Sequence, residues 1–523
     1  MRFTVKFSLR IVLVFITICS FNGAAWASYS SDEFLNELRA IINNAGGEFV
    51  FEKEKEGELR ERISSAQINF TIDQFFEANN SLNISIKYDH FIIEQVSDNK
   101  ISLELSAFSH ILIKSKNFLG DSFDLLIELK QTPITIFLER TGDVRNFFLK
   151  QAFLSQEVSR VFLNGSQIPI GFEIKLKDYL SSVHMNRDFQ RQMTTYEVES
   201  EIQDLSMFSE IIDSQIGLGT QITRVNNENI SSKFNLTLPD LEAIFRFIDE
   251  GINPLEKGLS LGVFYERTAG SSETIISNQD FNILTRLEDR GVQGGLGLSK
   301  NGINFLSRIL DLRLSLLSSE LSNLPLKTEF DEFSIEMEFP LLNKKNGSPF
   351  KFYLNIDDLL LSENIWELVG IENDFYKQAI SFRLDTSGDI NWLLNLMNLE
   401  ELESFSKNSP VEVNNLNINA FKISFGEVEI NGSGSFVFLN KEFQALGGFG
   451  LPQPVGEIRV ELKGAYRFVD ELMSKNIIDK QTGIFILGLI TVYTTSGNED
   501  DNLLSVIRIT ESGEILINNK SLQ

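Results

Sequence analysis

The sequence predicts an α+β protein that is mainly β, with long antiparallel curved sheets, an N-terminal helix and a C-terminal helical hairpin. Most of the chain alternates apolar and polar residues, which is the period of a strand with one buried face. Turn signals such as Asn99-Lys100 and Thr141-Gly142-Asp143 separate these runs. Segments near the two ends of the chain change to helical spacing. These three observations define the expected fold class.

The first 27 residues have the three parts of a secretory signal peptide: a positive start, an apolar run and a cleavage motif. These parts are Arg2, Lys6 and Arg10, then Ile11 to Phe21, then Ala25-Trp26-Ala27. We therefore expect cleavage between Ala27 and Ser28 and a periplasmic product without a transmembrane span. As a helix, the apolar run would rise about 16 Å, roughly half the thickness of a bilayer core.

Cys19 is the only cysteine of the chain and lies inside this leader. The exported product therefore has neither a disulfide nor thiol chemistry, so packing must supply its stability. Lipoprotein processing at Cys19 is an alternative, although Ile18 stands where that route uses Gly, Ala or Ser. The 523 residues carry a net charge of −26, which disfavours nucleic acid and anionic bilayers as partners.

Length and changes of pattern suggest three β-rich units after the leader. We expect a signal peptide at 1–27, an N-terminal β-rich unit at 28–205, a middle β-rich unit with short helices at 206–410, and a C-terminal unit of strands plus a helical hairpin at 411–523.

Within the N-terminal unit, one helix precedes a series of strands. Ser30 and Glu33 have the spacing of a capping box, and apolar residues then recur at helical intervals until Gly46-Gly47. Strand alternation follows at 68–72, 82–88, 101–105 and 134–138. Antiparallel sheet with one face in water is typical of this pattern.

The middle of the chain mixes element types. We expect short helices at 239–250 and after Ser362, where Leu361 and Trp366 stand at the positions of a hydrophobic staple. The leucine-rich segment 304–321 has helical spacing and predicts a further helix. Residues 258–300 predict strands separated by Gly-rich turns, including Gly294 to Gly297.

The last hundred residues predict strands around a helical hairpin. A long strand is expected over 428–438, bent at Gly432 and Gly434, and a second over 458–462. Two helices are expected at 466–475 and 479–493, turned at Asn476. The second is apolar nearly all round and too short to span a bilayer, so we expect it to be buried. A β-hairpin around 511–514 ends the chain.

This ending resembles that of a known family. The segments Phe425 to Phe436, Gly513 to Gln523 and Leu361 to Trp366 are similar to the secreted alphaproteobacterial family catalogued as domain of unknown function 2125. The resemblance covers the chain after the leader, but its specific motifs lie in 355–523. It implies an exported protein of long sheets and brings no established activity or catalytic residues.

Three glycine motifs are weak candidates for chemistry. Gly258-Leu259-Ser260-Leu261-Gly262 matches a nucleophile elbow, but strand-forming residues follow Ser260 and all three histidines precede it. Gly297 and Gly302 have phosphate-loop spacing, yet Ile303-Asn304 stand where Lys and Ser/Thr are required. Gly217-Leu218-Gly219 lacks the third glycine of a dinucleotide turn. We interpret all three as structural glycines.

Metal sites are also disfavoured. His90, His110 and His184 are isolated from one another, and no mature cysteine could complete a zinc site. The acidic run Asn498 to Asn502 lacks the glycine and distal glutamate of an EF-hand loop, so we expect a solvated turn. The sequence therefore predicts no catalytic residue, no cofactor-binding residue, no metal ligand and no cofactor.

The aromatic content is the one unusual bias, because the chain has 44 Phe but only 9 Tyr and 3 Trp. Filling a core explains most of them, and an open groove that shelters an acyl chain is the sharper hypothesis. We therefore predict a non-catalytic exported protein that binds an apolar, lipid-like ligand or an envelope partner. A periplasmic glycan hydrolase with a carboxylate pair and a purely structural envelope protein are the alternatives.

Overall fold

The computed structural model describes residues 30–522 except 45, 74–80, 117–121, 143, 165, 189–191, 214–218, 240–252, 279–280, 321, 343–346, 369–377, 393–410, 443–451, 476 and 498–500. The predicted cleavage site at Ala27 and Ser28 lies outside these residues, as does the predicted helix at 239–250 except for Pro239. The chain forms two compact units, which we describe separately: unit 1 holds residues 1–234 and 270–285, and unit 2 holds 235–269 and 286–523.

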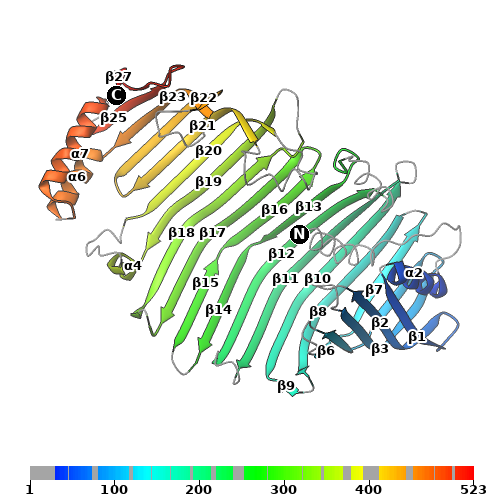
Figure 1. Ribbon diagram of the computed structural model, residues 1–523. Coiled ribbons are helices and arrows are strands. Elements are labelled where there is room, and N and C mark those ends of the chain that lie inside the picture. The colour runs from blue at the N-terminus through cyan, green and yellow to red at the C-terminus, as the bar shows by residue number, and fades with distance from the viewer. Residues whose placement is uncertain are drawn as a thin grey trace. The chain divides into compact units, whose positions relative to one another are not determined.

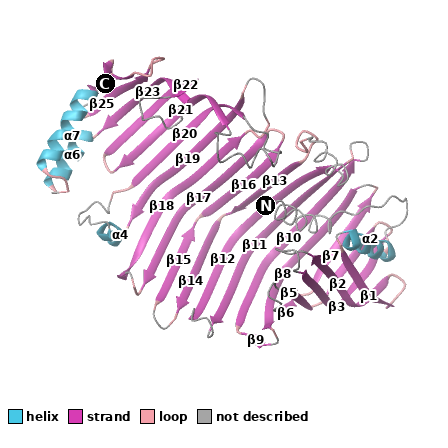
Figure 2. Ribbon diagram, viewed as in Figure 1, coloured by secondary structure: helices cyan, strands magenta, loops and turns pink. Residues whose placement is uncertain are grey.

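Antiparallel sheet dominates both units, with 75% of the described residues in strands and 10% in helices (Figures 1 and 2). The prediction of a mainly β protein is confirmed. Helices are too few for the α+β label to be useful. Within the described residues they are α2 (Ser31–Asn44), α4 (Glu363–Leu368), α6 (Ala465–Ser474) and α7 (Lys480–Tyr493).

Unit 1 is an antiparallel meander in which most strands pair with a neighbour in the chain (Figure 1). Its strands are β1 (Gly47–Lys55), β2 (Arg60–Asp73), β3 (Ser81–Ser97), β4 (Lys100–Leu105), β5 (Phe108–Lys116), β6 (Ser122–Gln131), β7 (Ile134–Thr141), β8 (Val144–Leu163), β9 (Ser166–Ile168), β10 (Ile170–Asp188), β11 (Met193–Asp213), most of β12 (Gly219–Pro239) and β14 (Ala269–Ser277). The short strands β4 and β5 pair with different halves of the long strand β3. In the same way, β6 and β7 pair with different halves of β8.

The best-buried core of unit 1 lies beneath α2. The predicted capping box is present, since the Glu33 amide donates to Ser30 Oγ at 3.2 Å and the Ser30 amide to Glu33 Oε2 at 3.1 Å. Nearby, Glu37 of α2 forms ion pairs with Arg140 and Arg145 at 3.6 and 3.3 Å. The buried apolar side chains around this helix are Phe34, Leu35, Ile42, Phe49, Ile63, Ile93 and Ile101.

Unit 2 is also an antiparallel meander. Its strands are β13 (Ser260–Arg267), β16 (Gly291–Ser299), β17 (Gly302–Ser318), β18 (Ser322–Phe339), β19 (Ser348–Leu361), β20 (Ile380–Trp392), β21 (Val411–Phe425), β22 (Val428–Glu442), β23 (Pro452–Lys463), β24 (Thr495–Ser496), β25 (Asn502–Ile509), β26 (Ile515–Ile517) and β27 (Lys520–Ser521). The remaining strand β15 (Asn282–Asp289) is divided between the two units. From β16 to β23 every strand pairs with its successor, and β25 follows β23.

Several long strands contain one residue with a left-handed backbone, and the apolar side chains change parity there. In β17 the residue is Asp311 at φ 48°, and in β19 it is Asp358 at φ 50°. Apolar residues take odd numbers in β17 up to Ile309 and even numbers from Leu312. One face of the sheet therefore stays apolar although the sequence pattern slips by one residue.

Two predictions for the middle of the chain are wrong, and a third is confirmed. Residues 304–318 belong to strand β17 and not to a helix. Gly294 to Gly297 lie inside strand β16, where each is paired with β17, and not in a turn. Helix α4 follows Ser362 as expected, but the Ser362 hydroxyl accepts a hydrogen bond from the amide of Lys327 at 2.9 Å and holds the helix to β18.

The predicted C-terminal elements are present. Strand β22 runs through Gly432 and Gly434, α6 and α7 form the helical hairpin, and β25 pairs with β26 around the turn at 511–514. The prediction that the second helix is buried is wrong, because Ile484 and Phe485 of α7 are 67% and 65% exposed. Part of the apolar surface of α7 is therefore exposed and not buried in the interior.

Candidate functional site

The sheet of unit 2 has one apolar face, which follows from its strand register. Residues directly opposite each other on neighbouring strands point to the same side of a sheet. One such row crosses β13, β16 to β23 and β25, and it consists of Val263, Leu296, Phe305, Met337, Phe352, Thr386, Ile418, Gly434, Ile458 and Ile507. All but one of its side-chain-bearing members are apolar.

A second row of the same face is equally apolar. It consists of Val292, Ile309, Phe333, Ile356, Phe382, Ile423, Ile430, Leu462 and Leu503. Between the two rows, the rings of Phe382 and Phe421 meet edge to face with centroids 6.1 Å apart. We call the side of the sheet that carries these rows the apolar face.

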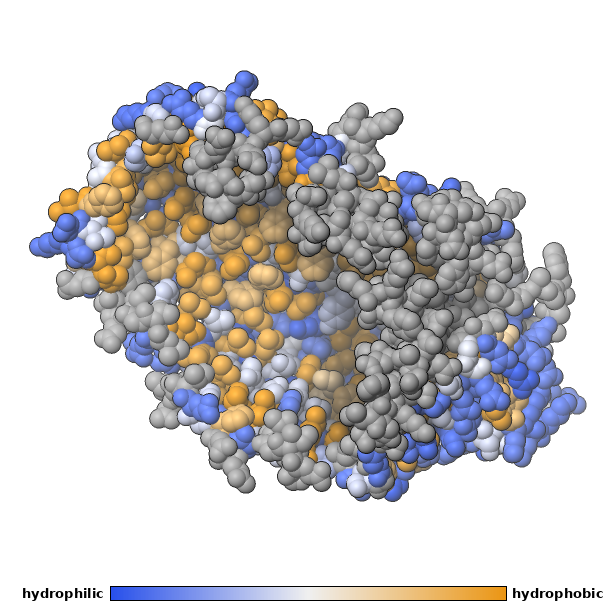
Figure 3. Space-filling model, viewed as in Figure 1, coloured by the Kyte–Doolittle hydropathy of each residue, from blue (hydrophilic) through white to orange (hydrophobic). Residues whose placement is uncertain are grey.

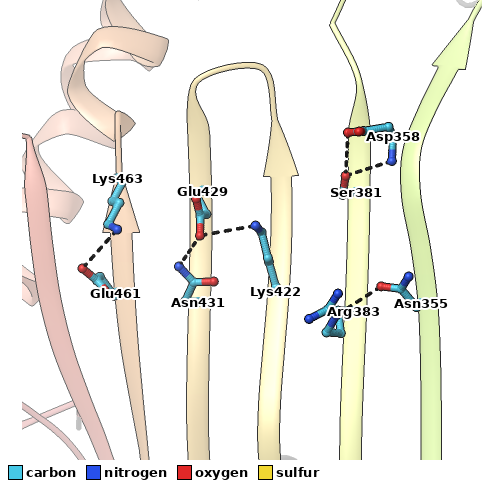
Figure 4. Close-up of polar contacts among 9 residues, drawn as sticks. All are labelled: Asn355, Asp358, Ser381, Arg383, Lys422, Glu429, Asn431, Glu461 and Lys463. Atoms are coloured by element: carbon cyan, nitrogen blue, oxygen red, sulfur yellow. Dashed lines mark hydrogen bonds and ion pairs between the residues drawn. The ribbon is translucent and has the colours of Figure 1, made fainter. Parts of the chain in front are cut away.

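The opposite side of the same sheet is polar. Its matching row consists of Gln293, Arg308, Ser334, Asn355, Arg383, Lys422, Asn431 and Glu461. Figure 4 shows five of these side chains, from Asn355 to Glu461, with their polar partners: Arg383 Nε donates to Asn355 Oδ1 at 3.2 Å, and Lys422 Nζ lies 3.6 Å from Glu429 Oε1. This side is therefore polar and rich in hydrogen bonds and ion pairs, and two members of its row, Ser334 and Asn355, are buried.

The apolar face is only partly covered. Figure 3 shows a hollowed region lined by hydrophobic residues over the strands of unit 2. Three neighbours in the first row, Val263, Leu296 and Phe305, are each more than a third exposed. Among the described residues of unit 2, the buried apolar side chains are Leu236, Leu255, Ile390, Trp392, Ala465, Val469 and Leu503. Such a short core beside so many apolar strand residues leaves apolar surface in contact with solvent.

Aromatic contacts close the two ends of the strands. At one end, Phe425 of β21 packs against Trp366 of α4 and Phe468 of α6, with ring centroids 6.2 and 5.8 Å apart. At the other end, Trp392 meets Phe339 edge to face at 5.4 Å and donates its Nε1 hydrogen to the Pro340 carbonyl at 2.6 Å. These rings fix both rims of the apolar face.

The glycine motifs have structural roles. Ser260 begins strand β13 and no helix follows it, so it does not stand on a nucleophile elbow. Gly302, at φ 130°, lies at the turn between β16 and β17, and Gly297 lies within β16. A side chain at Gly219 would overlap the Ser277 carbonyl, which explains this glycine by close backbone approach. Gly217 and Leu218 lie outside the described residues.

The histidines stay apart in the structure. His90 lies in β3, His110 in β5 and His184 in β10, where His184 Nδ1 is 2.6 Å from Asn146 Oδ1 on β8. Within the part of the chain that the structure describes, no three His, Cys, Asp or Glu side chains are grouped as metal ligands.

Asp501, the described acidic member of the expected solvated turn, caps a helix. Its carboxylate accepts hydrogen bonds from the amides of Tyr466 and Arg467 at 3.0 and 3.1 Å, at the first turn of α6. The negative charge also lies where the helix dipole favours it. The other acidic residues of this run, Glu499 and Asp500, lie outside the described residues.

Carboxyl groups of the sheet surface are held in their ionised form. The hydrogen bonds from Arg308 lower the pKa of Glu332, and the hydrogen bond from Asn431 lowers that of Glu429. Arg267 binds Asp289 through two hydrogen bonds of 2.7 and 2.5 Å. A glycosidase needs one carboxyl with a raised pKa as its general acid. The lowered pKa values of Glu332 and Glu429 are the opposite of what such an acid needs.

Comparisons with known proteins find no relative of this chain. No protein-family model matches the chain, and neither a curated protein nor a solved structure is significantly similar to it. Among the described residues, no helix is long and apolar enough to cross a membrane.

Sequence reasoning pointed to apolar strand residues but missed the extent of the apolar face. The change of apolar parity at Asp311 and Asp358 is visible in the sequence, but only the left-handed backbone at these residues shows that both halves of each strand share one face. The exposed side of α7 also went unnoticed, because an all-apolar helix ordinarily indicates burial.

Proposed function

We propose that this protein binds an apolar, lipid-like molecule along the apolar face of unit 2, and that it does so as an exported, periplasmic protein without catalysis. The observation that carries the proposal is the row from Val263 to Ile507, which crosses the sheet, is apolar at every side chain but Thr386, and is only partly covered. The signal-peptide pattern of the first 27 residues supports the compartment.

Energetics favour an occupant on this face. Covering one Leu, Ile or Phe side chain completely is worth about 1.5–3 kcal/mol. Partial cover of several half-exposed side chains in one row therefore outweighs the cost of ordering a flexible chain. An extended acyl chain fits because the row is long, narrow and lined almost only by carbon. The resemblance to the secreted family of unknown function agrees with this role and stays a prediction.

Binding of a fluorescent fatty acid tests the proposal. Phe305→Asp places a charge on the apolar face, and Asn304→Asp adds the same charge to the opposite side of the same strand. We expect Phe305→Asp to weaken binding about tenfold or more, because desolvating the new carboxylate opposes the ligand. Asn304→Asp should bind like the unmodified protein.

Native mass spectrometry of protein purified without detergent gives an independent reading. Apolar adducts that are lost in Phe305→Asp and kept in Asn304→Asp would support the proposal. Ligand-free spectra together with no saturable uptake of the fatty acid would overturn it, as would equal loss in the two variants. Urea unfolding of both variants shows that each is folded.

A further inference from the structure

We propose that the exposed side of helix α7 docks onto a zwitterionic lipid bilayer and lies in its interface. This inference goes beyond ligand binding by the sheet and does not depend on it. Four apolar side chains, defined here as the α7 stripe, carry it: Ile484, Phe485, Leu489 and Val492. Each of them is at least 43% exposed, and Ile484 and Phe485 are 67% and 65% exposed.

The stripe faces away from the rest of the hairpin. On the other side of α7, Gly483 is buried against Met473 of α6, where any side chain would overlap the methionine. Residues 484, 488 and 492 recur every fourth position, and 485, 489 and 492 follow at spacings of four and three. This spacing gathers the stripe on one helix surface. The exposed apolar residues of α7 therefore lie together on one side of the helix, although its inward side is apolar as well.

The α7 stripe lies in a segment without acidic residues, although the protein as a whole is acidic. Residues 480–497 contain no Asp or Glu, whereas the whole chain contains 73. Lys480 begins the helix, and Lys520 reaches its last turn, where its Nζ donates to the Val492 carbonyl at 3.3 Å. Lysines at both ends of an apolar stripe can place their ammonium groups beside lipid phosphates while the stripe enters the acyl region.

The size of the stripe fits a bilayer better than a second protein copy. The 14 residues of α7 make a helix about 21 Å long and about 10 Å wide. Its footprint is therefore about 210 Å², far below the roughly 800 Å² per partner of a stable protein interface. A helix lying in the lipid interface needs no larger surface, because the surrounding lipid adapts to it. At this length α7 cannot cross the bilayer core of about 30 Å.

The hairpin is held firmly enough to present the stripe. Ala465 and Val469 of α6 are buried, and the ring of Phe468 packs against Phe425 of the sheet. Asp501 caps α6, and Asp479 caps α7 by accepting the Thr482 amide hydrogen at 2.8 Å. A preformed helix avoids the ordering cost that a disordered segment would meet on binding.

Co-flotation of the full chain with phosphatidylcholine vesicles tests the inference. The double variant Phe485→Asp, Leu489→Asp removes the centre of the stripe. Its matched control is Phe153→Asp, Leu180→Asp, which replaces an exposed phenylalanine and an exposed leucine of unit 1 with the same charges. We expect the unmodified protein and the control to float with vesicles, and the α7 variant to lose at least about tenfold in partitioning.

Three outcomes would overturn the inference. One is absence of flotation by the unmodified protein, and another is equal loss in the two double variants. The third is a self-association, seen by analytical ultracentrifugation without lipid, that the α7 variant abolishes, since a second copy would then cover the stripe. Fatty-acid uptake by the α7 variant reports on the sheet separately, so failure of one proposal is distinguishable from failure of the other.

Discussion

Single left-handed residues decide which side chains of a long strand share a face. In β10, Lys175 and Lys177 are exposed before Asp178, which has φ 47°, and Leu180 is exposed after it. The exposed positions thus move from odd to even numbers at this residue. Asp311 and Asp358 act in the same way in unit 2, and Asn and Asp tolerate this backbone better than most residues.

Substitution of Asp358 tests this role. The Ser381 hydroxyl lies 3.1 Å from the Asp358 amide, whose hydrogen it accepts, and 3.3 Å from Asp358 Oδ1, to which it donates (Figure 4). Asp358→Ala loses the carboxylate contact and also strains the backbone, whereas Asp358→Gly loses only the contact. We expect Ala to be less stable than Gly by about 1 kcal/mol in urea unfolding. An alanine variant as stable as the glycine variant would contradict the proposed backbone role.

At the scale of elements, the wrong helix at 304–321 has a physical cause. The apolar residues of β17 keep odd numbers up to Ile309 and even numbers from Leu312, and Leu306, Leu310 and Leu317 lie outside that alternation. A strand pattern that slips by one residue produces spacings of three and four, which is also the signature of a helix. The sequence does not reveal the φ angle of Asp311, so it cannot separate these two readings. Uninterrupted alternation, as in β4 and β7, predicted strands correctly.

Two glycines of β22 offer a matched test of strand packing. A Cβ at Gly434 would overlap the Glu457 carbonyl of β23, whereas one at Gly432 would lie 3.4 Å from the Arg459 carbonyl. We therefore expect Gly434→Ala to destabilise the protein by about 2 kcal/mol or more, because the β22–β23 ladder must shift. Gly432→Ala should be neutral or slightly stabilising. Thermal unfolding of both variants checks this order, and equal effects would refute it.

For the whole molecule, the sequence predicts the class of fold correctly but not the site, and the periplasmic compartment stays a prediction. Alternating runs at 68–72 and 428–438 were enough to predict antiparallel sheet, because a strand's period is local information. The apolar face depends on which residues of different strands stand opposite each other, as Phe305 and Met337 do. Register is fixed by long-range pairing and by left-handed residues, neither of which a single sequence displays. The composition therefore shows an excess of Phe, but it does not show how the Phe residues are arranged on the sheet.

The net charge of the chain and two of its paired carboxylates together predict a bell-shaped dependence of stability on pH. The net charge of −26 destabilises the compact state by self-repulsion at neutral pH, and this repulsion weakens as the pH falls toward the pI of 4.7. Glu332 and Glu429 act in the opposite direction, because their pKa values lie below the ordinary value of 4.5. Their contribution is complete above that value and is lost as the pH falls through their lower folded pKa.

We therefore expect the midpoint of urea unfolding to be highest at about pH 5 and to fall on both sides. Salt at about 0.5 M should flatten the neutral side, since it screens repulsion between exposed charges. It should change the acid side less, because the hydrogen bonds from Arg308 and Asn431 are short-range. Stability that rises steadily up to about pH 8 at low salt would show that the paired carboxylates outweigh the repulsion of the whole chain.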